Sequence, residues 1–339
     1  MKPIAVIILN WNGAHLLQRY LPSVVKFTNS DLADVIVADN GSTDSSRELL
    51  RTEFPDVKTL LFDQNWGFAE GYNKSIRETG YRYTVLLNSD IRCCEGWLEP
   101  LYELMEANPD VGAVQPKLLK DYGEGDDRQT FEYAGGAGGY IDKHGYPYCR
   151  GRIFGDVEED EGQYDGEVQD VFWATGACIM VRSEEYLKVG GLDKDFFAHM
   201  EEIDLCWRML NAGFRLCMVP QSKVYHLGGG SLPQGNPRKT YLNFRNNLLL
   251  LHKNLPVKDG KKTLFIRRLY DTLAIVQSLL TGHVADAKAI VKAHNDFKKM
   301  RNNYTQHPEK NLLKATPEGR RNIIVDYYLR RRKKFSQLK

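Results

Sequence analysis

The sequence predicts an α/β protein in which a mostly parallel sheet is flanked by helices and followed by a helical C-terminal extension. Over the first 115 residues, near-continuous apolar runs alternate with helical patterns, which is typical of a parallel sheet buried on both faces. Polar clusters follow several of these runs, at the place where such sheets bind ligands. Beyond Pro237 the periodic patterns are helical and rich in Lys and Arg.

The apolar runs of the first third of the chain are expected to form strands at residues 4–9, 35–38, 59–62, 84–87 and 111–114. Helical patterns lie between them, near residues 14–26, 44–53, 68–79 and 96–107. Right-handed crossovers connect parallel strands, so the carboxyl ends of these strands share one edge of the sheet. Ligands are expected at that edge.

The second part of the chain is less regular. Residues 117–170, rich in Gly, Asp, Glu and Tyr, are expected to form an irregular loop or a small hairpin region over the sheet. A strand is then expected at residues 172–181, a helix at 200–212 that ends at Gly213, and strands at 215–219 and 223–226. The remaining helices are predicted at residues 239–253, 263–281, 283–301 and 317–335.

Composition excludes several classes of protein. With 42% hydrophobic and 27% charged residues among 339, the chain is globular rather than disordered, collagen-like or coiled-coil. No apolar run reaches the roughly 18 residues of a membrane span. The first apolar run ends at Asn10 without a small-residue cleavage site, which favours a buried strand over a signal peptide. The protein is therefore expected to be cytoplasmic. Six cysteines without C-x-x-C spacing indicate reduced thiols.

Charge is distributed unevenly along the chain. Residues 253–339 hold 21 lysines and arginines against 7 acidic residues, a net charge of +14, whereas the preceding residues carry −12. A basic tail on an acidic body indicates a partner for the tail. A membrane surface is one such partner, and a solvated helical face or a dimer contact are the alternatives.

Polar residues follow the second and third expected strands. Asp39 and Asn40 end the second strand, where a carboxylate can accept hydrogen bonds from a nucleotide base or ribose. A turn with a helix cap explains the same residues equally well. Gly67 and Gly71 at the next helix start permit the close approach of a ligand or of a packing neighbour, and packing is the favoured interpretation.

Further along the chain, Asn88, Ser89 and Asp90 end a fully apolar strand. Asp90 is a candidate ligand for a divalent cation that in turn holds a diphosphate, although a strand-ending turn is the alternative. His226 ends a later strand and is either a metal ligand or hydrogen-bonded structure. Lys239 and Arg245 either neutralise phosphates or belong to a solvated helix face.

The strongest chemical signal is an acidic cluster at the start of the helix expected at 200–212. Glu201, Glu202 and Asp204 lie among apolar residues that include Phe196 and Trp207. Clustered acids in apolar surroundings have raised pKa values, which suits a general base. Stabilisation of the helix dipole is the alternative explanation.

The order of these stretches resembles family 2 glycosyltransferases of the GT-A fold, especially the bacterial rhamnosyltransferase-like branch. The matching stretches are residues 8–13, 39–44, 65–73, 88–90, 175–178, 201–208 and 226–231. The resemblance implies a GT-A nucleotide-sugar-binding fold, with a Rossmann-like sheet, over residues 1–236. Residues 1–115 would form its nucleotide-binding half, residues 116–236 its acceptor and catalytic half, and residues 237–339 the basic helical extension.

The resemblance also implies roles for the candidate residues. Glu202 takes the place of the usual catalytic Asp, beside Glu201 and with Asp204 in reserve. Asp90 takes the metal-binding place of the DXD motif, and His226 completes the site for Mg²⁺ or Mn²⁺. The donor nucleotide would contact Asp39 beside the turn at Asn10, Trp11 and Asn12, and the remaining donor-binding candidates are Asn40, Gly67, Gly71, Asn73, Asn88, Ser89, Lys239 and Arg245.

The function implied by the resemblance is that of an inverting glycosyltransferase. Its donor would be a nucleotide-diphosphate sugar, dTDP-rhamnose or a UDP-sugar, and its acceptor a lipid-linked saccharide on the inner face of the cell membrane, with no role for nucleic acid. The alternative is a non-catalytic glycan- or polyanion-binding protein on the same scaffold. A nicotinamide-dependent oxidoreductase is excluded, because residues 10–13 read Asn-Trp-Asn-Gly where that class needs G-x-G-x-x-G.

Overall fold

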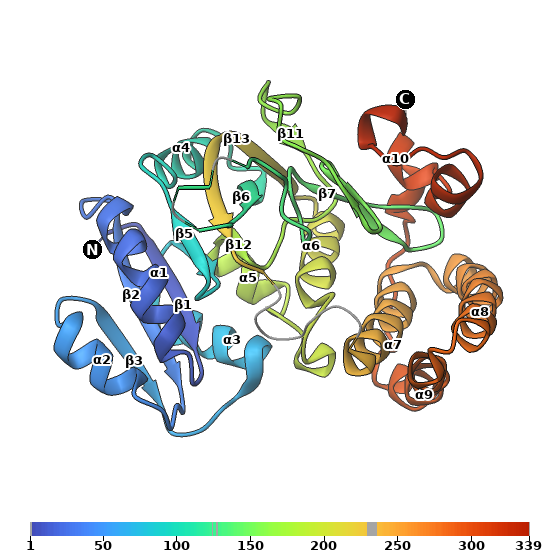
Figure 1. Ribbon diagram of the computed structural model, residues 1–339, viewed down its shortest axis with the longest axis horizontal. Helices are drawn as coiled ribbons and strands as arrows, with labels where there is room; N and C mark the ends of the chain where they lie inside the picture. Colours follow the sequence, from blue (N-terminus) through green and yellow to red (C-terminus); the bar gives the residue numbers. More distant parts are fainter. Residues whose placement is uncertain (1, 124, 127, 229–235, 339) are drawn as a thin grey trace.

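A parallel sheet forms the first half of the molecule (Figure 1). The computed structural model describes residues 2–123, 125–126, 128–228 and 236–338. Strand β1 (Ile4–Asn10) pairs in parallel with β2 (Ala33–Asn40) and with β4 (Tyr83–Leu87), and β2 pairs in parallel with β3 (Lys58–Phe62). The connecting helices are α1 (Ala14–Phe27), α2 (Ser46–Glu53) and α3 (Gly67–Thr79). This half of the chain agrees with the pattern predicted from the sequence.

Beyond β4, the sheet contains both parallel and antiparallel strand pairs. Its order is β11-β13-β6-β12-β4-β1-β2-β3, and β5 (Ile91–Cys93) also pairs with β13. Strand β12 (Cys178–Arg182) runs antiparallel between β4 and β6 (Val111–Lys120), whereas β13 (Arg215–His226) is parallel to β6. Helix α4 (Glu99–Ala107) precedes β6, and the short β11 (Gln169–Asp170) is an edge strand. The sheet is therefore mixed, and its end formed by β4, β1, β2 and β3 is parallel.

Three of the predicted strands differ from the structure. The strand expected at 172–181 begins only at Cys178, because the preceding backbone bonds outside a strand ladder: Thr175 N donates to the side-chain Oε1 of Gln115 in β6, and the carbonyl of Ala177 accepts from Asn88 N. The strands expected at 215–219 and 223–226 are one strand, β13, whose pairing register shifts between Val219 and Lys223.

The irregular region at 117–170 contains a second, smaller sheet. Strand β6 extends to Lys120, and four short strands follow in the order β10-β9-β8-β7. They are β7 (Gly139–Ile141), β8 (Pro147–Cys149), β9 (Arg152–Ile153) and β10 (Asp156–Val157). After β12 come α5 (Ser183–Lys188), a 3₁₀ turn (Lys194–Phe196) and α6 (Glu201–Asn211). The hairpins lie between the main sheet and the C-terminal helices (Figure 1).

The C-terminal helices are α7 (Pro237–Asn254), α8 (Val257–Leu280), α9 (Val284–Met300) and the short α10 (Pro317–Arg320). Leu249 and Leu251 of α7 share a buried cluster with Trp207 of α6 and Ile7 of β1, so α7 packs into the core of the sheet half. The division of the chain at residue 236 stays a prediction. No helix in the described parts of the chain is both long and apolar enough to cross a membrane.

The helix predicted at 317–335 is wrong beyond Arg320. Arg321 adopts extended backbone, and its carbonyl accepts a hydrogen bond from Lys143 N. Ile323 N donates to Asp142 Oδ2, 3.0 Å away. These bonds to the turn between β7 and β8 replace the intrahelical ones, and the chain continues as a π-helical turn (Val325–Leu329) and a 3₁₀ turn (Phe335–Leu338).

Candidate active site

The predicted base and the predicted metal-binding segment meet at one short loop. Asn88, which follows β4, donates its backbone N–H to the carbonyl of Ala177 at 2.9 Å. The neighbouring Gly176 lies against Glu202, since a Cβ built on it would come within 3.3 Å of the Glu202 Cβ. The loop before β12 therefore has the polar end of β4 on one side and the start of α6 on the other.

Asp90 and His226 are in contact, although 136 residues separate them in the chain. Asp90 Oδ1 lies 3.1 Å from His226 Nε2, and both side chains are buried. Pairing of β5 with β13 aligns Ile91 with His226, which fixes this approach. Burial alone would raise the pKa of Asp90, but its hydrogen bond and charge attraction to His226, together with backbone hydrogen bonds, outweigh burial and lower the pKa.

A second carboxylate, Glu132, approaches His226 from the other ring nitrogen. Glu132 Oε1 lies 3.4 Å from His226 Nδ1, and Glu132 is only 3% exposed. Burial lowers the pKa of His226, but its interactions with Asp90 and Glu132 prevail and raise that pKa to about 10. No motif in the sequence pointed to Glu132, because it belongs to the irregular region.

The donor atoms of this cluster fit a divalent cation. Carboxylate oxygen and imidazole nitrogen are suitable ligands, and neighbouring ligands of an octahedral ion are about 3 Å apart, close to the 3.1 Å between Asp90 and His226. A carboxylate behind a histidine ligand, as Glu132 is here, orients the ring. The described residues contain no group of three or more His, Cys, Asp or Glu arranged as a metal site. An ion held here would therefore need further ligands from water or from a diphosphate.

Glu201 and Glu202 begin helix α6 in an environment that disfavours their charge. Each has one carboxylate oxygen, Oε2, that is buried without a hydrogen-bond partner among the described residues. Burial raises the pKa of Glu202 to about 7. Burial, together with the nearby Glu202, raises the pKa of Glu201 well above its usual value. A pKa near 7 suits a general base at neutral pH.

The loop that leads into α6 is strained. Phe197, His199 and Met200 all have positive φ angles, of 66°, 67° and 72°, which non-glycine residues rarely adopt. Strain of this kind persists only when the surroundings hold it, and it concentrates at functional sites. Here the surroundings are two polar side chains of α7.

Asn246 and Arg245 hold that loop. Asn246 Nδ2 donates to the carbonyls of Phe196, Ala198 and His199 at 2.7–2.8 Å. Arg245 Nη2 donates to the carbonyls of Asp195 and Phe196 at 2.9 and 2.8 Å. Arg245 was expected to neutralise donor phosphates, and in the structure its buried guanidinium supports the loop before α6. Asn246 was not singled out from the sequence.

Asp204, the reserve candidate for the base, belongs to an ion-pair network. Its side chain is fully buried and accepts hydrogen bonds from Arg208 Nε at 2.8 Å, Lys253 Nζ at 2.8 Å and Asn254 Nδ2 at 2.7 Å. These partners outweigh the effect of burial and lower the pKa of Asp204. A carboxylate bound to two cations is a poor proton acceptor, which leaves Glu202 and Glu201 as candidates.

The residues expected around the donor nucleotide gather at the ends of β1 and β2. Asp39 is fully buried and accepts hydrogen bonds from Asn10 Nδ2 at 3.2 Å and Arg47 Nε at 2.6 Å. Asn12 Oδ1 accepts from the backbone of Thr43 at 2.7 Å. Trp11 is 56% exposed beside this cluster. Arg47, which covers Asp39, was not singled out from the sequence.

The residues of α3 serve mainly in packing. A Cβ on Gly71 would lie 2.8 Å from the Leu9 side chain, so the glycine lets α3 approach β1. Asn40 Oδ1 accepts from Trp66 N, and its Nδ2 donates to the carbonyl of Gly67. Asn73 is buried and fully bonded, to both backbone groups of Leu192 and to Tyr186. Asn73 was expected to bind the donor, and the structure gives it this internal link instead.

The remaining predicted residues lie at the edges of the site. Asn88 and Ser89 are partly exposed, next to the buried Asp90. Lys239, in the first turns of α7, lies 5.8 Å from the ring centre of Tyr133, and burial lowers its pKa. Gly229, Gly230 and Ser231 of the histidine motif lie outside the described residues.

Comparison with known proteins agrees with this arrangement. Residues 5–157 match the model of the family described as Glycosyl transferase family 2. An N-acetylglucosaminyl-diphospho-decaprenol L-rhamnosyltransferase of Mycobacterium tuberculosis is 25% identical over 242 residues, which cover 66% of this chain and 75% of that protein. A low-salt glycan biosynthesis hexosyltransferase of Haloferax volcanii is 21% identical, covering 74% of this chain and 75% of that protein.

Two solved structures share the fold. The crystal structure of GalNAc-T7 with UDP, GalNAc and Mn²⁺ superposes with a TM-score of 0.55 and 17% identity, over 75% of this chain and 48% of that one. The mannosyltransferase PcManGT of Pyrobaculum calidifontis, in complex with GDP-Man and Mn²⁺, gives a TM-score of 0.53 and 14% identity, over 87% and 86% of the two chains. These structures show that the chain has the GT-A fold, and the sequence comparisons show that residues 5–157 match glycosyltransferase family 2 and that the chain is similar to a rhamnosyltransferase.

Proposed function

We propose that this glycosyltransferase transfers a sugar, with inversion, from a nucleotide-diphosphate donor to a hydroxyl of a saccharide acceptor, and that Glu202 is the base. One observation carries the proposal. Glu202 has a pKa of about 7 and a buried, unpartnered carboxylate oxygen, and the Gly176 loop connects it to the metal-binding segment at Asn88.

The proposed reaction is a single displacement. Glu202 accepts the proton of the acceptor hydroxyl while that oxygen bonds to the anomeric carbon of the sugar. The bond from this carbon to the donor diphosphate breaks on the opposite face, and its electron pair leaves with the diphosphate. Attack opposite to the leaving group inverts the anomeric configuration. General-base assistance of this kind typically contributes about 10²–10⁴-fold in rate.

Asp90 and His226 would hold a divalent cation, Mg²⁺ or Mn²⁺, which supplies charge neutralisation at the leaving diphosphate. Glu132 would orient the ring of His226, because its Oε1 lies 3.4 Å from Nδ1 while Nε2 faces Asp90. The Mn²⁺ in both solved structures supports a metal-dependent reaction. Lys239 is well placed for an additional interaction with the donor, because it lies close to Glu132 and Tyr133.

The donor would bind at the ends of β1 and β2, where Asp39, Asn10 and Asn12 meet. The rhamnosyltransferase relative supports dTDP-rhamnose as the donor, and the UDP in the GalNAc-T7 structure supports a UDP-sugar. The same relative acts on a decaprenol-linked saccharide, which supports a lipid-linked acceptor and a location at the inner face of the cell membrane.

Helix α8 supports a membrane surface as a further partner. Phe265, Leu269, Leu273, Val276 and Leu280 recur at helical spacing and are between 47% and 83% exposed. The exposed basic residues Lys258, Lys261, Lys262 and Arg268 lie on the same helix. Each such cation near an anionic membrane contributes about 1 kcal/mol, and a basic helix with an exposed apolar face is typical of a helix that lies in the membrane interface.

A thermal-shift panel of UDP-, dTDP- and GDP-sugars with and without Mn²⁺ tests the proposed donor site. A ligand at 100 times its Kd stabilises the folded chain by about 2.7 kcal/mol, which raises the Tm measurably. We expect one nucleotide class to raise the Tm only with Mn²⁺, and Asp90→Ala to abolish the metal-dependent part. Equal shifts with and without the metal would contradict the role of Asp90.

The same panel, followed by an assay for donor hydrolysis, separates the transferase from a non-catalytic glycan-binding protein. A transferase slowly releases the nucleoside diphosphate from its donor in water, and Glu202→Gln suppresses that release while the Tm shift persists. A binding protein would show glycan affinity without release of the nucleotide.

A further inference from the structure

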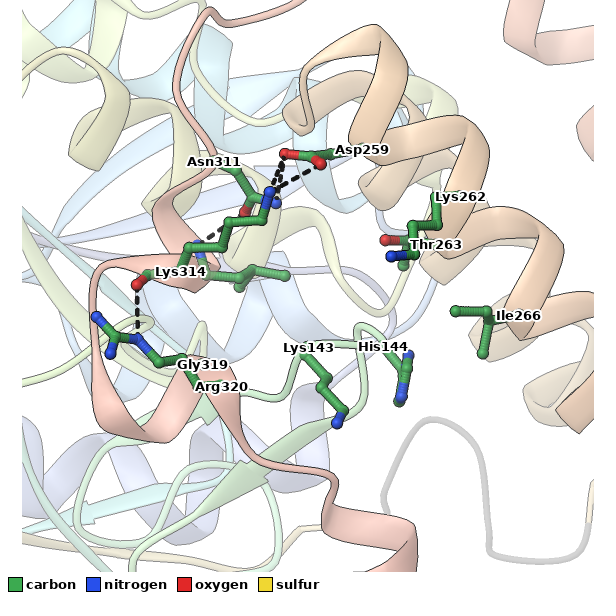
Figure 2. A pocket seen from close by; sticks show the side chains of 11 residues that line it. Lys143, His144, Asp259, Lys262, Thr263, Ile266, Asn311, Lys314, Gly319 and Arg320 are labelled. Atoms are coloured by element: carbon green, nitrogen blue, oxygen red, sulfur yellow. Dashed lines mark hydrogen bonds and ion pairs between the residues drawn. The ribbon is translucent and has the colours of Figure 1, made fainter.

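A second cavity lies outside the proposed active site, between α8 and the C-terminal segment. It has a volume of about 420 Å³. Its walls are the turn between β7 and β8, the first part of α8 and residues 311–320, as Figure 2 shows. None of its lining residues takes part in the proposed transfer reaction.

The lining of this cavity is strongly basic. Lys143, Lys262, Lys314 and Arg320 line it, and Asp259 is the single acidic side chain among the lining residues. Lys314 lies 2.9 Å from both carboxylate oxygens of Asp259, which neutralises this charge. Lys143 and Lys262 have no ion-pair partner among the described residues. The cavity therefore holds an excess of positive charge.

A buried polar atom in the cavity also has no partner. His144 lines the wall beside Lys143, is 8% exposed, and its Nδ1 has no hydrogen-bond partner among the described residues. Burial, with the nearby cations Lys143 and Arg267, lowers the pKa of His144 to about 4, so the ring is neutral at pH 7. A neutral ring can donate an N–H, and leaving a buried polar atom unbonded is costly. An anion in the cavity would provide the missing acceptor.

We propose that this cavity binds a phosphate group, held by Lys143 and Lys262 and accepting a hydrogen bond from His144. A phosphate offers several strong acceptor oxygens, which suits the lysine and imidazole donors that line this cavity. Lys262 and Ile266 line the cavity from the same helix that carries the exposed Phe265 and Leu269. The headgroup of an anionic phospholipid is thus one source of the phosphate, and a soluble phosphate compound is the other.

The phosphate site itself does not depend on the proposed transferase function, whereas the lipid source rests on the proposed membrane association. Binding is measured on the full chain with inorganic phosphate, by calorimetry and by the NMR signals of the His144 ring. Vesicle flotation then compares phosphatidylcholine alone with mixtures that contain phosphatidylglycerol. The test variant is Lys143→Gln/Lys262→Gln, and the matched control is Lys258→Gln/Lys261→Gln, which removes the same charge outside the cavity.

We expect the test variant to weaken phosphate binding about tenfold and the control to change it less than about twofold. If only the test variant also loses its preference for phosphatidylglycerol, the source is a lipid headgroup; if vesicle binding is unchanged, the source is soluble. Equal losses in both variants, or no phosphate-dependent change at His144, would overturn the proposal. Donor hydrolysis should be unchanged in both variants, which separates failure here from failure of the transferase proposal.

Discussion

Helix α8 and the strands of the main sheet place their apolar residues in opposite ways. In β1 the side chains from Ile4 to Ile8 are at most 1% exposed. In α8 the buried residues are Gly260, Thr263, Arg267 and Asp271, whereas Phe265, Leu269 and Leu273 are between 56% and 65% exposed. The same residue types form a core in one region and an exposed surface in the other.

The polar side of α8 faces inward because it has partners there. Arg267 Nη2 donates to Asp271 Oδ1 at 3.2 Å, and His294 Nε2 of α9 lies 2.9 Å from Asp271 Oδ2. Arg267 also stacks over the ring of Tyr146, 3.9 Å from its centre. The burial of Arg267 and Asp271 is thereby compensated, and the apolar side is left for an external partner. The apolar side chains of β1 are thus covered within the chain, whereas those on the exposed side of α8 are not.

The largest effect should come from the sheet half. Glu202→Gln removes the base but keeps the shape of the side chain, so we expect the transfer rate to fall by at least about 10²-fold while the donor still binds. Steady-state kinetics with a soluble acceptor measures the rate. The control, Leu269→Gln/Leu273→Gln on α8, should keep nearly full activity in the same assay. An active Glu202→Gln enzyme would show that another group is the base.

The pH dependence should follow the same carboxylate. Because the pKa of Glu202 is raised to about 7 and a base must be deprotonated, the rate should rise with pH up to about 7 and then level off. Below that pKa the rate should fall about tenfold per pH unit. A pH profile of kcat/KM checks this, and Glu202→Gln should flatten its acidic limb. An unchanged limb in that variant would assign the titration to another residue.

Truncation of matched leucines tests the comparison directly. Leu86 is buried in β4 and Leu269 is exposed on α8. Leu86→Ala should cost about 2–5 kcal/mol of unfolding free energy, because it leaves a cavity in the core. Leu269→Ala should cost less than about 0.5 kcal/mol. Urea unfolding of both variants measures the difference, and a large loss for Leu269→Ala would mean that α8 is covered in the free protein.

Asn246→Ala should have an intermediate effect. It leaves the carbonyls of Phe196, Ala198 and His199 without their shared donor, which should cost about 1–3 kcal/mol. Because these bonds hold the strained loop before α6, kcat should fall more than donor affinity. Asn243→Ala, on the same helix, is the control for helix α7 as a whole. Equal losses of kcat in the two variants would contradict the positioning role of Asn246.

The smallest effect on stability, with a clear effect on localisation, is expected for the apolar face of α8. Leu269→Gln/Leu273→Gln should leave the Tm nearly unchanged, since both side chains are exposed. Each buried leucine contributes about 1.5–3 kcal/mol at an apolar interface, so binding to anionic vesicles should drop more than tenfold. Flotation and light scattering measure binding and oligomeric state. Unchanged flotation together with loss of a dimer would identify a second copy as the partner.

The sequence by itself determined the parallel half of the fold, the order of the motifs and the family. These features depend on local periodicity and on residues that are adjacent in the chain, such as Asn88, Ser89 and Asp90, so they can be read from the sequence alone. The proximity of Asp90 and His226 was expected only from the family resemblance, and the structure confirmed it. The broken helix after Arg320 was not predictable, because its competing hydrogen bonds come from Asp142 and Lys143.

Only the tertiary structure decided which candidate residues have side chains that are bound by neighbours inside the protein. Asn73, Asp204 and Arg245 look like site residues in the sequence, but partners 4 to 119 residues away bind their side chains. Glu132 and Asn246 carry no motif, yet they contact His226 and the loop before Glu202. Periodicity marks α8 as amphipathic without saying which face is buried. The physical reason is that hydrogen bonding and burial are set by neighbours in space, and a linear pattern records only neighbours in the chain.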